Sequence, residues 1–172
     1  DVTGDAVTIK IYSQSKMVIE DTNHFNATYG IEMKGDPRRF TIRNSRFHNI
    51  SEMAVGGNMH GVIPNPAGGA DIQTTTGEIL YNYVQAPLAL EVNQDSLAMR
   101  VDVYRNTFVG SVCMTRVDSA DGPFTLNRNV IINYDNGTPP GSHVLQCGAV
   151  ADQTRIGLSE NLVGTPAQNI VD

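Results

Sequence analysis

The chain has 172 residues, of which 40% are hydrophobic and 17% are charged, so it is long enough to bury a core and too apolar for a disordered chain. The low charge content also excludes a coiled coil, and no apolar run approaches the roughly 18–20 residues of a membrane span. The net charge of −6 and the pI near 5.1 disfavour nucleic acid as a partner, because phosphate contacts need clustered Lys and Arg.

A repeated unit runs through the chain. In chain order, six segments share one pattern of apolar and hydrogen-bonding positions: Met17–His24, Phe40–Phe47, Gly77–Val84, Val101–Phe108, Phe124–Ile131 and Ile156–Val163. Their third residues, which are Ile19, Ile42, Ile79, Val103, Leu126 and Leu158, are separated by 23, 37, 24, 23 and 32 residues. The base period is therefore near 23, with one long insertion between Phe47 and Gly77 and a shorter one between Ile131 and Ile156.

Positions within the unit predict its local structure. The first and third residues are apolar, which is the period of two that is typical of a short strand. The sixth residues are all small and hydrogen-bonding: Thr22, Ser45, Asn82, Asn106, Asn129 and Asn161. We expect them to form an internal asparagine ladder, in which Asn turns the chain because it tolerates the left-handed backbone region. The eighth residues, such as Phe47 and Phe108, are mostly apolar and are predicted to be buried.

A second strand follows roughly ten residues later in most units. These strands are Tyr29–Met33, Leu88–Val92, Val112–Val117 and Val144–Ala149, with Ala6–Tyr12 as the same strand of an earlier coil. Short strands at a period near 23, without helical periodicity, predict an all-β fold, a right-handed parallel β-helix of about six coils. A propeller would need units of roughly 40–45 residues. We expect a single domain over residues 1–172 that is either a piece of a longer helix or a unit that stacks end to end.

Alternation along the second strand predicts which side chains face outward. The inward residues are expected to be Ile31, Met33, Leu88, Leu90, Val92, Cys113, Thr115 and Val117, with Ala89 outside. One outer face then carries Lys10, Glu32, Lys34, Glu91, Arg116 and Asp118. Such a column of mixed charges can bind an extended polysaccharide, or it can simply keep the face soluble.

Other polar residues give weaker signals. The long insertion contains His60 and Asp71, which are candidates for substrate binding because loops on a rigid scaffold often carry binding residues. Cys113 and Cys147 fall at equivalent positions on neighbouring coils, so either a disulfide or a reduced pair is compatible with the pattern. Asn26, Asn49 and Asn136 each begin a glycosylation sequon.

The stretch from Leu88 to Asn129 resembles the β-helix polysaccharide lyases, in particular the group of alginate lyases and chondroitinase B. The motifs that carry the resemblance are Leu88–Val92, Arg105–Phe108 and Cys113–Arg116, in that order. The resemblance implies that Glu91 helps to hold calcium and that Arg116 assists catalysis at the leaving oxygen. The turn Gln94–Leu97 stands where the family has its catalytic lysine.

These features lead to two hypotheses about function. The first is a secreted or cell-surface β-helix that binds or processes polysaccharide through Lys34, Glu32, Glu91, Arg116 and His60, with calcium or no cofactor. If it is an enzyme, the expected reaction is β-elimination on uronates. The alternative is a structural or adhesive protein whose coils form a stiff spacer and associate end to end or laterally. Neither hypothesis involves nucleic acid or a membrane span.

Overall fold

The computed structural model describes residues 6–11, 16–33, 39–59, 75–94, 99–114, 124–132 and 156–164, and every regular element in these ranges is a β-strand. The strands are β1 (Val7–Ile11), β2 (Met17–Glu20), β3 (Asn23–Met33), β4 (Arg39–Arg43), β5 (Arg46–Met59), β6 (Thr75–Leu80), β7 (Tyr83–Gln94), β8 (Met99–Tyr104), β9 (Thr107–Met114), β10 (Phe124–Asn127), β11 (Val130–Ile132), β12 (Ile156–Ser159) and β13 (Leu162–Gly164).

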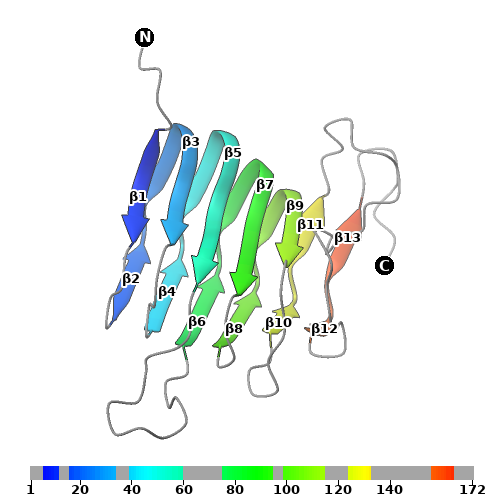
Figure 1. The fold of residues 1–172 in the computed structure, drawn as a ribbon. Helices are drawn as coiled ribbons and strands as arrows, with labels where there is room; N and C mark the ends of the chain where they lie inside the picture. The colour runs from blue at the N-terminus through cyan, green and yellow to red at the C-terminus, as the bar shows by residue number, and fades with distance from the viewer. Residues whose placement is uncertain are drawn as a thin grey trace, which may run out of the picture.

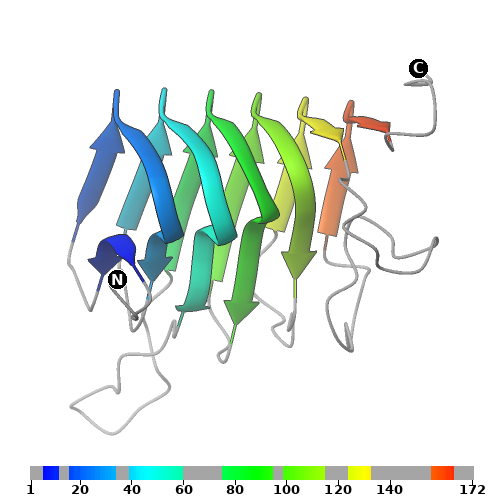
Figure 2. The same cartoon turned by 90° about the horizontal axis from the view of Figure 1, so that it is seen from above.

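Two parallel sheets form the walls of a right-handed β-helix (Figure 1). Sheet A contains the odd-numbered strands in the order β1-β3-β5-β7-β9-β11-β13, and sheet B contains the even-numbered strands from β2 to β12. Each coil contributes one strand to each sheet, and successive coils stack side by side along one axis (Figure 2). The predicted all-β parallel β-helix is therefore confirmed.

The hydrogen-bonded register reproduces the repeat alignment residue by residue. In sheet B the third residues of the units form one row, in which Ile19 pairs with Ile42 and the row continues through Ile79, Val103, Leu126 and Leu158. In sheet A the eighth residues form a second row: His24, Phe47, Val84, Phe108, Ile131 and Val163. A period of 23 with an apolar pair two residues apart was therefore sufficient to predict the pairing in sheet B and at the start of the sheet A strands.

The core lies between the two sheets and consists of these rows. The largest fully buried side chains include Phe40, Phe47, Phe108, Ile42 and Leu126, as the repeat predicts. Val101, Val103 and Ile131 are also buried. Side chains at equivalent positions of successive coils pack on one another along the axis. This stacking fills the interior without a helix.

The turn between the sheets differs from the prediction in one respect. Asn was expected in the left-handed backbone region at the sixth position of the unit. The residue in that region is instead the fifth residue of each unit. These residues are Asp21, Asn44, Tyr81, Arg105, Arg128 and Glu160, with φ between 51° and 57°. The Asn side chain instead points inward and satisfies backbone groups at the corner, so a bulky residue takes the strained conformation next to it.

The bend inside sheet A is where simple alternation failed. Two buried rows flank the bend, one through Phe108 and one through Val112. The second row follows the first by seven residues in β3, eight in β5, six in β7 and only four in β9. The strand pairing therefore shifts register at each bend. Ala89 is consequently buried, although alternation placed it outside, and Leu88 is half-buried. After the bend of β9 the buried side chain is Val112, and Cys113, which alternation placed inward, pairs with the outward Glu91. A shift of one residue exchanges the faces of every later position.

Candidate functional surfaces

The charged column expected on sheet A is present in part. Lys10 pairs with Glu32 in the register, and the row continues through Gly56 to Glu91. The Lys10 Nζ lies 3.0 Å from Glu32 Oε2, so these two opposite charges form an ion pair across neighbouring coils. Strand register alone therefore brings Lys10, Glu32 and Glu91 onto one outer face.

Gly56 interrupts this column between the two carboxylates. A Cβ on Gly56 would lie 2.4 Å from the carbonyl oxygen of Glu91, so close packing of the backbones requires glycine here. The Glu91 carboxyl beside it is half-buried, and this burial raises its pKa above the ordinary value. The carboxylate therefore sits in a less hydrated position than an ordinary surface glutamate.

The other candidate residues of the sequence analysis, on this face and elsewhere, lie outside the described ranges. They are Lys34, His60, Asp71, Arg116, Asp118 and Cys147, and the side chain of Cys113 is also outside the description. Within the residues that are described, no group of three or more His, Cys, Asp or Glu side chains comes together as a metal site. Calcium binding by Glu91 therefore stays a prediction from the resemblance.

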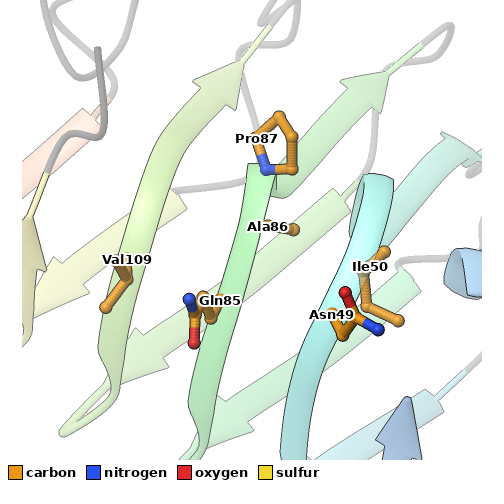
Figure 3. Close-up of a pocket in the computed structure, with 6 residues that line it drawn as sticks. All are labelled: Asn49, Ile50, Gln85, Ala86, Pro87 and Val109. Atoms are coloured by element: carbon orange, nitrogen blue, oxygen red, sulfur yellow. The ribbon is translucent and has the colours of Figure 1, made fainter. Parts of the chain in front are cut away.

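A shallow groove that the sequence did not reveal lies at the bend of sheet A (Figure 3). Its volume is about 230 Å³, and its lining comes from three successive coils: Asn49 and Ile50 of β5, Gln85, Ala86 and Pro87 of β7, and Val109 of β9. The amides of Asn49 and Gln85 are exposed, whereas Ile50 and Ala86 form a buried apolar floor. No charged side chain lines the groove.

Hydrogen bonds hold the two amides of the groove in place. Asn49, which has a positive φ of 53°, donates from its side-chain amide to Oδ1 of Asn26 on the preceding coil. The Tyr83 hydroxyl donates to Gln85 Oε1 at 3.3 Å. Sequence analysis noted Asn26 and Asn49 only as sequons. Their spacing of 23 residues was a signal that they stack, but nothing in the pattern showed the groove beside them.

A third surface lies on the outside of sheet B, where Arg39 begins β4 and Arg100 is the second residue of β8. Arg39 pairs with Thr76, and Thr76 pairs with Arg100. Next to this row, Glu78 pairs with Asp102. These positions face solvent, so apolar periodicity carries no signal for them.

Comparisons with known proteins do not assign the chain to a family. No family model matches it, and no curated protein or solved structure is detectably similar. In the described part of the chain there is no helix that is long and apolar enough to cross a membrane.

Proposed function

We propose that the protein binds an extended polysaccharide along the outside of sheet A, in a secreted or cell-surface setting. The observation that carries this proposal is the uncharged groove formed by Asn49, Gln85 and their apolar neighbours across β5, β7 and β9. A groove that crosses successive coils runs along the axis of the helix, and it therefore suits a long ligand.

The lining of the groove matches the chemistry of a sugar ring. Each amide offers an acceptor oxygen and two N–H donors, which complement the hydroxyl groups of a saccharide. Asn49 uses one N–H for its bond to Asn26, and Gln85 uses its oxygen to accept from Tyr83, so both amides are held in defined orientations. The C–H face of a sugar can contact Pro87 and Val109. A few fixed polar groups over an apolar lining are typical of small-ligand sites.

The repeat of the scaffold supports a polymeric ligand. Neighbouring coils are about 4.8 Å apart, which is the spacing between strands, and equivalent positions recur at that interval. Asn49 and Gln85 occupy adjacent coils and can contact successive parts of one chain. The ion pair between Lys10 and Glu32 and the Glu91 carboxyl border the same sheet and add polar contacts to its outer face.

A glycan array, followed by calorimetry on the best polymer, tests this proposal. Gln85→Ala should weaken binding by about tenfold, the effect of losing a bond to a buried ligand group. Asn49→Gly removes the second amide while keeping a residue that tolerates the positive φ. Asn23→Ala is the matched control, because Asn23 is an exposed amide of sheet A that does not line the groove. The absence of binding across the array would contradict the proposal.

A catalytic form of the function is β-elimination on a uronate polymer, with Glu91 holding calcium and Arg116 assisting the leaving group. It is supported by the resemblance and by the position of Glu91 beside the gap at Gly56. The test is the ultraviolet absorbance of the unsaturated product, with and without calcium, in the native protein, Glu91→Gln and Arg116→Ala. Product that disappears in both variants would establish a lyase, whereas no product in any form would leave a binding protein.

The alternative function is a stiff structural or adhesive spacer, and a specific observation favours it. Outward side chains form pairs along the axis. The Arg43 Nε donates to Glu20 Oε2 at 2.6 Å, and the Arg128 Nε donates to Glu160 Oε2 at 2.5 Å. The ring of Phe25 stacks on His48 with 5.5 Å between centroids. Contacts of this kind join coils and stiffen the column. Self-association in sedimentation experiments, together with no glycan binding, would favour the spacer.

A further inference from the structure

A row of positive charges lies along the outer face of sheet B. We define it as Lys16, Arg39 and Arg100, which are all exposed. Lys16 and Arg39 directly precede Met17 and Phe40, which pair with each other, so the two cations lie at the same level on neighbouring coils. Arg39 and Arg100 are separated by Thr76 and hence by two coils, or about 10 Å at the usual spacing between strands.

The row borders a depression with a volume of about 310 Å³. Arg39 and Arg100 form two of its sides, and Thr76 lies between them as a much shorter side chain. Glu78 and Asp102 line the adjoining side. A short residue between two arginines thus leaves room for a ligand group to contact both guanidinium groups.

The cations of the row have few ionic partners among the side chains that the structure describes. Among the described residues, neither Lys16 nor Arg39 has an ion-pair partner within 4 Å. The Arg100 Nε donates to Asp102 Oδ2 at 3.2 Å, which uses only one of the five N–H groups of a guanidinium. Free donors on two arginines can each bind a carboxylate or sulfate group through two bonds.

The acidic residues beside the row restrict the ligand further. Glu78 and Asp102 lie opposite each other on neighbouring coils, and such like charges repel. Each carboxylate already accepts a bond from a threonine: Thr41 donates to Glu78 at 3.4 Å and Thr125 donates to Asp102 at 2.6 Å. They can accept further bonds from ligand hydroxyls, whereas they repel a ligand that is uniformly negative.

The geometry points to a second binding site, separate from the groove on sheet A, in which Arg39, Arg100 and Lys16 hold the acid groups of an anionic polysaccharide while Glu78 and Asp102 accept its hydroxyls. A dense polyanion such as DNA has no sugar hydroxyl at each repeat and would place phosphates against both carboxylates. Spaced acid groups separated by hydroxyls satisfy both sides of the depression.

Calorimetry on four polymers tests the site: polygalacturonate, sparsely sulfated dextran that keeps most of its hydroxyls, uncharged dextran and single-stranded DNA. We expect one or both acidic glycans to bind, with the preferred one showing whether the acid group is a carboxylate or a sulfate. The variant Arg39→Gln/Arg100→Gln should lower that affinity by about tenfold or more. The control Arg43→Gln/Arg128→Gln removes the same charge from two exposed arginines outside the row and should leave the affinity within about twofold.

Several outcomes would overturn the site: equal affinity in the Arg39/Arg100 variant and its control, DNA binding as tight as that of the glycans, or no binding by either acidic glycan. Circular dichroism and thermal unfolding of both double variants establish that they are folded. Because Gln85 and Asn49 lie on the other sheet, binding of a neutral glycan in the groove is measured independently, and its presence or absence decides the function proposed above.

Discussion

Asn106 donates both its backbone N–H and its side-chain N–H to Oδ1 of Asn129 on the next coil, each at 3.0 Å. The second side-chain N–H of Asn106 bonds the carbonyl oxygen of Ile79 on the preceding coil at 2.8 Å. Asn82 makes the same pair of bonds to Asn106, so each amide joins three coils. The predicted asparagine ladder is confirmed, and Asn82, Asn106 and Asn129 are buried with their polar groups satisfied.

Replacing Asn106 by Leu should destabilise the protein by about 1–3 kcal/mol, because buried donors of Asn82 and the carbonyl of Ile79 lose their partner. Urea unfolding followed by circular dichroism measures the change. Asn23→Leu, at an exposed amide on sheet A, is the control and should have little effect. Equal stability of the two variants would show that the ladder does not stabilise the fold.

Replacing Phe108 by Ala should cost about 3–5 kcal/mol, since Phe108 is fully buried in the row between Val84 and Ile131 and a cavity would remain. Phe25→Ala is the matched control, because its ring is 49% exposed. We expect the control to lose far less stability in the same urea experiment. A small loss for Phe108→Ala would contradict the packing described here.

Stability should fall when the pH drops below about 6.5, because burial lowers the pKa of His24 from that model-compound value. The unfolded chain then binds a proton more readily than the folded chain. The stabilisation from neutral His24 is therefore present above the unfolded pKa and is lost as the pH falls through the folded pKa. In the structure the ring is 5% exposed, stacks on Phe47 at 4.5 Å and contacts the hydroxyls of Thr8 and Thr22, each at 2.9 Å.

Urea unfolding at pH 8 and pH 5, for the native protein and for His24→Phe, isolates this effect. All other titrating groups are common to both proteins, so the difference between their pH dependences reports His24. We expect the native protein to lose more stability than the variant on acidification. The same pH dependence in both would mean that His24 binds a proton equally in the folded and unfolded states.

Gly110→Ala should destabilise the protein by more than about 1 kcal/mol. Gly110 has a φ of 137°, and a Cβ there would lie 1.8 Å from the carbonyl oxygen of Ala86. Thermal unfolding measures the effect, with Val109→Ala at the adjacent half-buried position as the control. An unchanged transition temperature for Gly110→Ala would show that the short bend of β9 can relax.

Sequence predicted the straight parts of this fold and missed its bends. Ile42 and Phe47 were aligned correctly because apolar spacing and the 23-residue period both depend on side chains that must be buried. The bend between Phe108 and Val112 was not predictable, because bulges set by Gly110 change the residue count without changing which residues are apolar.

Like the fold, the candidate surfaces could be predicted only where they lie next to straight strands. Lys10, Glu32 and Glu91 were placed on one face because they lie close to buried rows whose register was clear. The depression between Arg39 and Arg100 was missed, since it depends on the length of Thr76 and on charges that no periodic pattern requires. Asn49 and Gln85 come together through the bend, which was itself not predicted.

Each strand of the two sheets packs against the equivalent strands of the coils before and after it. The molecule therefore behaves as a one-dimensional array, in which the energy of a coil depends on itself and its two interfaces. Gaining or losing a coil would change the length of the column by about 4.8 Å while keeping its cross-section. The length of the two outer faces is consequently set by coil number, independently of the chemistry within any one coil.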